Sequence, residues 1–198
     1  MKKIILASNS PRRKELLEKY GIEFSVTVSK ADENIKEYNS ASDFAVKASL
    51  AKAEAVLNKI KANKDFLKND YIIIAADTVV TLNNIIYGKP KNKDDAFKIL
   101  SELSGKTHYV ITGVTIIKII KNIKKENNLK TYTFFDKTEI KFKNISFKEI
   151  DEYIKTGEPF DKAGAYAIQG KAAKFVESIN GDFENVVGLP VYKVLKFL

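Results

Sequence analysis

The stretch YIIIAADTVV, residues 71–80, decides the fold of this chain. Its first six residues, Tyr71 to Ala76, form a continuous apolar run of the kind that is buried on both faces of a sheet. Helix and strand signals alternate along the chain that precedes this strand, and together they predict an α/β protein. Asp77 and Thr78 follow directly and place polar side chains at the end of the run.

Strand and helix signals alternate before this strand, and the middle of the chain that follows is antiparallel in pattern. Before it, we predict strands over 2–6 and 24–28, a helix that Ser10–Pro11 opens and Gly21 ends, and a long helix over 42–60. After it, we predict a hairpin at Asn83–Asn84, a helix over 94–103, strands over 109–120 and 130–142 with an exposed tip over 121–128, a helix opened by the capping box Ser146–Glu149, a strand over 175–179 with a turn at Asn180–Gly181, and a last helix from Pro190. This order predicts one domain, residues 1–198, with an elongated mixed β-sheet flanked by helices and two lobes around a central cleft.

Composition excludes several classes of protein. The 198 residues contain no cysteine and one histidine, which excludes disulfide scaffolds, thiolate metal sites and cysteine nucleophiles. No apolar run approaches the roughly 20 residues of a membrane span. The apolar run Ile4 to Ala7 is also far shorter than the roughly 7–15 residues of a signal peptide. We therefore expect a soluble protein of the cytoplasm that does not bind a membrane.

The net charge of +9 favours an anionic partner, although solvated surface lysine alone would produce it. All but two of the 34 basic residues are lysine, and the two arginines, Arg12 and Arg13, stand side by side. They follow a strand and a turn at the start of a helix, where backbone N–H groups bind anions and where cations oppose the helix dipole. We interpret this strand–turn–helix as a phosphate site, the alternative being a surface helix with stray basic residues.

Two further segments carry candidate chemistry. Asp77 could hold a divalent cation or act as a general base, and an Asx turn that closes the strand explains it equally well. The segment 157–170 gathers acids, a lysine and three glycines, and its Gln169 could read a base edge through its amide. We interpret His108 as structural and the basic segment 121–128 as a solvated tip, so nucleic acid is not expected as a partner.

Six stretches resemble, in order, the Maf family of nucleoside triphosphate pyrophosphatases: LASNSPRRKELL (6–17), AADTVV (75–80), GKP (88–90), TGV (112–114), GEPFDKAGAYAIQG (157–170) and NVVGLP (185–190). The resemblance implies a Maf/ITPase-like fold and a hydrolase acting on phosphoric anhydrides, which releases pyrophosphate with the help of Mg²⁺ or Mn²⁺. The stretch DKAGAYAIQG resembles the branch that prefers dTTP and UTP, with Ala167 where that branch usually has Gly.

The resemblance also assigns roles to residues of this sequence. Asp77 is the catalytic carboxylate, and Glu33 is a second acid that holds the metal with it. The phosphate-binding residues are Ser8, Ser10, Arg12, Arg13, Lys52 and Lys89, and the specificity positions are Arg12, Thr78 and Gln169. These roles fit the charge of a triphosphate, which needs several converging cations. Removal of non-ordinary nucleotides, a link to cell-division arrest and a homodimer are further expectations from the family.

Two alternatives stay open from the sequence. The first is the same chemistry on modified purine nucleotides such as 7-methyl-GTP. The second is a non-catalytic module that binds a nucleotide or nucleic acid and regulates division.

Overall fold

The computed structural model of the chain describes all residues except 1, 29–30, 32–34, 64–65, 67–68 and 121–127. The helices are α1 (Pro11–Lys19), α2 (Ala41–Lys61), α3 (Lys93–Leu103), α4 (Phe147–Lys155), α5 (Phe183–Val187) and α6 (Val191–Leu195), with 3-10 turns η2 (Glu158–Asp161), η3 (Ala163–Ala165) and η4 (Lys171–Phe175). The strands are β1 (Lys2–Leu6), β2 (Ser25–Val26), β3 (Asp70–Leu82), β4 (Ile85–Tyr87), β5 (Thr107–Ile120), β6 (Asn128–Phe142) and β7 (Val176–Asn180). None of the described helices is both long and apolar enough to cross a membrane.

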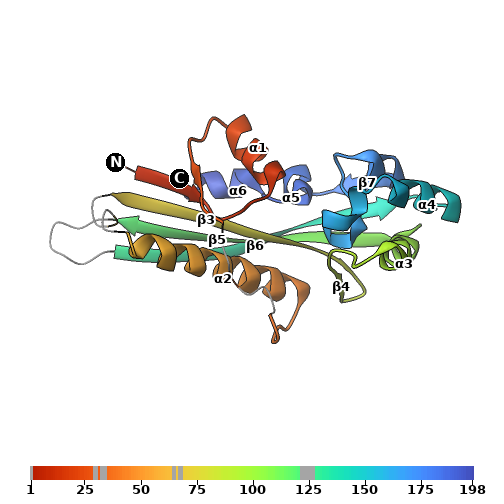
Figure 1. The fold of residues 1–198 in the computed structure, drawn as a ribbon, viewed down its shortest axis with the longest axis horizontal. Coiled ribbons are helices and arrows are strands. Elements are labelled where there is room, and N and C mark those ends of the chain that lie inside the picture. The colour runs from red at the N-terminus through yellow and green to blue at the C-terminus, as the bar shows by residue number, and fades with distance from the viewer. Residues whose placement is uncertain (1, 29–30, 32–34, 64–65, 67–68, 121–127) are drawn as a thin grey trace. The chain divides into compact units, whose positions relative to one another are not determined.

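The strands form one mixed sheet of seven strands, as the sequence predicts. Their order is β2-β1-β3-β5-β6-β7, and β4 pairs with β3. The strand β1 runs parallel to β2 and to β3, whereas β3–β4 and β6–β7 are antiparallel. The long strands β5 and β6 also run in opposite directions (Figure 1).

The chain divides into two compact units, which agrees with the two predicted lobes. Unit 1 comprises residues 1–77, 112–135 and 188–198, and unit 2 comprises residues 78–111 and 136–187. The boundaries fall inside β3, β5 and β6, so these three strands contribute residues to both units. The single domain over 1–198 and the cleft between the lobes stay predictions.

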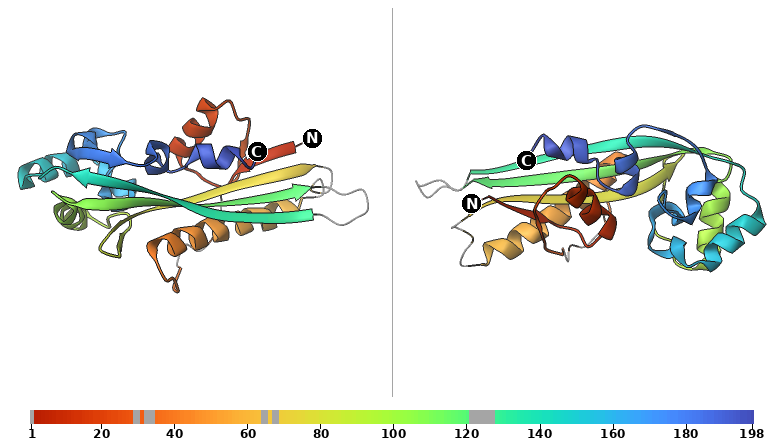
Figure 2. Two further views of the ribbon diagram at one scale, coloured as in Figure 1. Left: turned by 180° about the vertical axis from the view of Figure 1, so that it is seen from behind. Right: turned by 90° about the horizontal axis from the view of Figure 1, so that it is seen from above.

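Unit 1 has helices on both faces of its part of the sheet. Helix α2 covers one face, and α1 and α6 cover the other (Figures 1 and 2). The side chains of Ala53 and Val56 on α2 pack with Ile73 of β3 and Ile117 of β5 in one buried cluster. Since Ala53 leaves little volume between helix and sheet, the backbone of α2 lies close to β3 and β5.

Unit 2 contains the turn of the β3–β4 hairpin and helix α4. Local sequence signals explain both this turn and the start of α4. Asn83 and Asn84 both have positive φ, +51° and +64°, which is the conformation of a type I′ hairpin turn. Ser146 accepts from the backbone N–H of Glu149, whose carboxylate accepts from the backbone N–H of Ser146, so the predicted capping box is confirmed.

Three local predictions were wrong. The strand β3 continues through Asp77 to Leu82 because it enters the hairpin with β4, so Asp77 lies inside a strand and not at its end. Strand β2 is confined to Ser25–Val26. The Asn180–Gly181 turn leads into α5, a helix that we had not predicted. The predicted tip 121–128 stays a prediction, because residues 121–127 lie outside the described residues; β6 begins at Asn128.

Candidate active site

The two clearest candidate residues, Asp77 and Lys52, form an ion pair in unit 1. The Nζ atom of Lys52 on α2 lies 2.6 Å from Oδ1 of Asp77 on β3. Both side chains are mostly shielded from water, with 12% and 16% of their side-chain surface exposed. Charge-assisted hydrogen bonds of this length are strong, so the pair fixes the orientation of the Asp77 carboxylate.

Contacts between α2 and β5 set the position of Lys52. The hydroxyl groups of Ser49 and Thr115 are fully buried and lie 2.8 Å apart. Earlier on α2, a Cβ on Gly113 of β5 would lie 2.2 Å from the backbone carbonyl carbon of Ala45, so only glycine allows this approach. Lys52 follows Ser49 by one helical turn and is therefore held over the sheet where Asp77 emerges.

In the register of the sheet, the turn after β1 begins close to the position of Asp77 on β3. Leu6 pairs with Ile74, and the N–H of Ala7 donates to the carbonyl of Ile74 at 2.8 Å. Asp77 lies three residues beyond Ile74 on the same strand. The turn that carries Ser8 therefore follows the carboxyl end of the parallel pairing between β1 and β3, and so does Asp77. Open α/β sheets bind ligands at this end.

Ser10 is the N-cap residue of α1, as predicted, but its hydroxyl makes no capping hydrogen bond. Instead, the Oγ atom of Ser8 accepts from the backbone N–H of Ser10 at 3.2 Å and from Nη1 of Arg13 at 3.1 Å. A serine two residues before the N-cap thus orders the turn. The first turn of α1 contains no acidic residue, so its backbone N–H groups face no acid of their own helix.

The two arginines differ in their surroundings. Arg13 is 9% exposed, and its Nε atom donates to the carbonyl of Gly188 at 2.7 Å. Together with its bond to Ser8, this contact ties α1 to the segment that precedes α6. Arg12 is half-buried. Arg13 therefore organises the turn through at least two hydrogen bonds, while Arg12 stands beside it at the start of the helix.

Three predicted site residues, Thr78, Lys89 and Gln169, belong to unit 2. Thr78 is half-buried on β3, and Lys89 and Gln169 are exposed. The loops of Lys89 and Gln169 are joined, because the N–H of Gly164 donates to the carbonyl of Gly88 at 3.0 Å. Gly164 has a φ of +68°, and a Cβ there would lie 2.7 Å from the Val80 side chain, so this junction requires glycine.

The segment 157–170 is more ordered than the predicted loop. It forms the 3-10 turns η2 and η3 and then a turn in which the N–H of Gly170 donates to the carbonyl of Ala167. Gln169 lies within this last turn. These elements have no periodic signal in the sequence because single 3-10 turns are too short to show one.

His108 is structural in its geometry, as interpreted from the sequence. It is fully buried in unit 2, and its Nε2 atom lies 2.8 Å from the hydroxyl of Tyr166. Burial lowers the pKa of His108 to about 4, so the ring is neutral at pH 7.

The predicted metal ligands can be tested only in part. Glu33 lies outside the described residues. Among the described residues, no group of three or more acids or histidines gathers to hold a metal ion. Mg²⁺ commonly takes one or two carboxylates together with substrate phosphates, so the carboxylate of Asp77 fits as one ligand.

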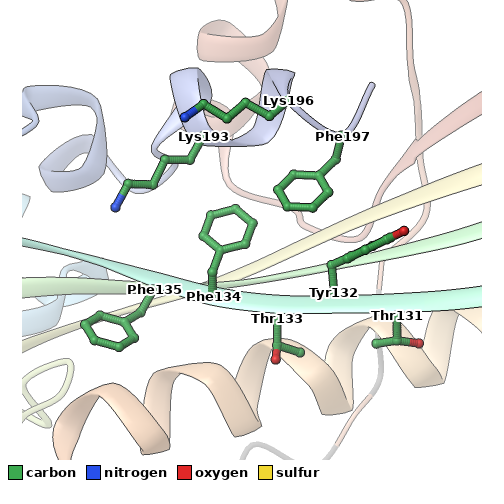
Figure 3. A pocket seen from close by; sticks show the side chains of 8 residues that line it. All are labelled: Thr131, Tyr132, Thr133, Phe134, Phe135, Lys193, Lys196 and Phe197. Carbon is green, nitrogen blue, oxygen red and sulfur yellow. The ribbon is translucent and has the colours of Figure 1, made fainter.

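A shallow aromatic groove lies elsewhere in unit 1 (Figure 3). The ring of Phe134 on β6 stacks on Phe197 at 5.5 Å between centroids. The residues that line the groove are Thr131, Tyr132, Thr133, Phe134, Phe135, Lys193, Lys196 and Phe197. None of the predicted site residues is among these described lining residues.

Sequence reasoning missed the residues that position the site. Gly113 lies in the middle of an apolar strand, and that placement is itself a signal of close backbone approach. Ser49 and Thr115 gave no comparable signal, because a buried hydroxyl pair between elements distant in sequence has no local pattern.

Comparisons with known proteins show the family of the chain. A family model described as "Maf-like protein" matches residues 3–198. A Bacillus cereus protein named dTTP/UTP pyrophosphatase is 47% identical over 198 residues, which cover 100% of this chain and 95% of that protein. A protein of the same name from Bacillus thuringiensis subsp. konkukian is 46% identical over the same shares. A solved nucleoside-triphosphatase / dITP/XTP pyrophosphatase from Mycobacterium abscessus aligns at a TM-score of 0.44 and 12% identity, over 100% of this chain and 93% of that one. The match along nearly the whole chain and the full-length relatives establish that this protein belongs to the Maf family.

Proposed function

We propose that this protein hydrolyses dTTP and UTP to the nucleoside monophosphate and pyrophosphate. The observation that carries the proposal is the shielded Lys52–Asp77 ion pair, which lies beyond the carboxyl end of the β1–β3 pairing. The names of the full-length relatives, dTTP/UTP pyrophosphatase, support the reaction and the substrate.

In the proposed reaction, a water oxygen attacks the α-phosphorus. The bond between that phosphorus and the oxygen bridging to the β-phosphate breaks, and pyrophosphate leaves. Asp77 accepts a proton from the attacking water through a carboxylate oxygen. Lys52 holds the other oxygen of Asp77, Oδ1, so the acceptor atom keeps one orientation during the attack.

Most of the remaining predicted residues are proposed to bind the negatively charged phosphates of the substrate. Ser8, Ser10, Arg12, Arg13, Lys52 and Lys89 are the proposed phosphate-binding residues. Of the two arginines, Arg12 is proposed to contribute more to phosphate binding, because Arg13 also donates to Gly188 and Ser8. Cations that contact the phosphates stabilise the charge that develops on their oxygens during transfer.

Asp77 and Glu33 are the proposed ligands of a divalent cation, Mg²⁺ or Mn²⁺. When bound, such an ion supplies positive charge next to the phosphates. Arg12, Thr78 and Gln169 are the proposed specificity residues, with the Gln169 amide facing the edge of the base.

An Asp77→Asn variant tests the proposal. We expect pyrophosphate release to fall by about 10²–10⁴-fold, the usual contribution of a general base, while nucleotide binding is retained. Asp70→Asn is a matched control, because Asp70 begins the same strand and has no proposed role. Unchanged turnover in Asp77→Asn would remove Asp77 from the mechanism, and release of single phosphates would contradict a pyrophosphatase.

The same measurements decide between the alternatives. Preference for 7-methyl-GTP would assign the chemistry to modified purines, and binding without turnover would favour a regulatory module. Removal of non-ordinary pyrimidine nucleotides in the cytoplasm, a link to division arrest and a homodimer complete the proposal and rest on the family alone.

A further inference from the structure

We propose that Glu158 and Tyr153 are positioning residues that fix the turn carrying Gln169 and thereby set the preference for uracil and thymine bases. The inference rests on the proposed function, since it concerns the specificity of the same site. All the residues involved belong to unit 2.

The turn Ala167–Gly170 presents Gln169 at its exposed side. Contacts with Tyr153 and Glu158 join its two ends. The backbone N–H of Ala167 faces the hydroxyl of Tyr153, which donates to Oε1 of Glu158 at 2.9 Å. Past the other end of the turn, the backbone N–H of Lys171 donates to Oε2 of Glu158 at 3.1 Å.

Packing restricts the same carboxylate. Tyr153 is 2% exposed and comes from α4, so the hydroxyl that bonds Glu158 is anchored in the core of unit 2. A Cβ on Gly170 would lie 2.1 Å from Oε1 of Glu158. The φ of Gly170 is −105°, which any residue can adopt, so this position needs glycine only to admit the carboxylate. The Glu158 carboxylate thus occupies the space that a side chain at position 170 would need.

We call the contacts of Glu158 with Tyr153 and Lys171 the Glu158–Tyr153 clamp. The chemistry of base recognition by a glutamine amide explains why the clamp matters. Uracil and thymine present a carbonyl acceptor and an N–H donor, whereas cytosine presents an amino donor and a ring-nitrogen acceptor. A glutamine amide satisfies either pattern by exchanging its oxygen and nitrogen positions. Discrimination therefore requires that the amide keep both one place and one orientation. The Glu158–Tyr153 pair is proposed to fix the place, because it restrains the backbone on both sides of Gln169.

Glu158→Ala and Glu158→Gln test the proposal together. Alanine removes both acceptors. Glutamine can accept from Lys171 through its oxygen and donate to the Tyr153 hydroxyl through its nitrogen, so it should restore the clamp. We expect the ratio of kcat/KM for UTP over CTP to fall by about tenfold in Glu158→Ala and to stay near wild type in Glu158→Gln. Asp151→Ala, which removes an exposed carboxylate of α4, is the matched control and should leave the ratio unchanged.

Hydrogen–deuterium exchange of the peptide that spans 167–171 gives a readout that needs no turnover. We expect faster exchange there in Glu158→Ala only. Faster exchange with an unchanged UTP/CTP ratio would overturn the role in specificity, and unchanged exchange would overturn the clamp itself. If the wild-type protein turned over no nucleotide, the proposed function would fail, while the exchange measurement would still decide whether the clamp exists.

Discussion

Lys52 on α2 and Asp77 on β3 meet through atoms 2.6 Å apart, although 24 residues separate them in the chain. The pair depends on β1, β3 and β5 being neighbours and on α2 lying close over them. The site in unit 1 is therefore a product of helix-on-sheet packing, and the packing residues should affect turnover as well as stability.

The ion pair itself gives the first prediction. Lys52→Met should lower kcat by about 100-fold, because the Asp77 carboxylate loses the group that orients it. Each of Lys52→Met and Asp77→Asn should also lower the free energy of unfolding by about 1–3 kcal/mol, a value between those of exposed and buried pairs. Urea denaturation of the two single variants and the double variant measures the coupling, and additive losses would contradict a direct interaction.

The close approach at Gly113 gives the second. Gly113→Ala should lower the free energy of unfolding by about 2–3 kcal/mol, since the new methyl group must displace the backbone of α2 at Ala45. Turnover should fall with it, because Lys52 lies on the displaced helix. Gly21→Ala is the control: its φ is +66° and no atom lies within 4 Å of the added Cβ. That variant should lose about 1 kcal/mol and keep full activity.

The buried hydroxyl pair gives the third. Thr115→Val should cost about 1–2 kcal/mol of stability, since Ser49 loses one partner while it still donates to the carbonyl of Val46. Thr115→Val should also lower turnover, because the bond helps to place Lys52, whereas Thr115→Ser keeps the hydroxyl and should keep most of the activity. If valine and serine variants had equal turnover, the Ser49–Thr115 bond would have no part in placing Lys52.

His108 gives a prediction about pH. Its folded-state pKa, about 4, lies below the ordinary value of 6.5, so the unfolded chain binds a proton that the folded chain does not. The contribution of His108 to stability is therefore present above pH 6.5 and is lost as pH falls toward 4. Between pH 7 and pH 5 the loss should be about 2 kcal/mol.

His108→Gln isolates this effect, because glutamine can bond the Tyr166 hydroxyl without titrating. Its free energy of unfolding should fall less than that of the wild type over the same pH range. Equal slopes in the two proteins would mean that another group causes the acid sensitivity.

Local signals predicted much of the fold. The strand β1, the Asn83–Asn84 turn and the capping box of α4 each follow from neighbouring residues, and the structure has all three. The sequence predicts Asp77 at the end of a strand because the apolar run Tyr71 to Ala76 stops there. In the structure β3 continues through that acid and reaches the hairpin with β4, which pairs Val80 to Leu82 with Ile85 to Tyr87.

The candidate site likewise contains residues that the sequence identifies and contacts that only the structure shows. The sequence singled out Asp77, Arg12 and Arg13 by residue type and context. It could not show that Ser8, and not Ser10, orders the turn, since both serines stand before the same helix. The Glu158–Tyr153 clamp likewise joins two elements through side chains, and such contacts leave no periodic trace in a sequence.

Pyrophosphate release tests the central claim most directly. Wild-type protein would be assayed with Mg²⁺ or Mn²⁺ on dTTP, UTP, CTP, the purine triphosphates and 7-methyl-GTP. We predict stoichiometric monophosphate and pyrophosphate, with the highest kcat/KM for dTTP and UTP. Folded protein that releases no pyrophosphate from any of these nucleotides would contradict the account.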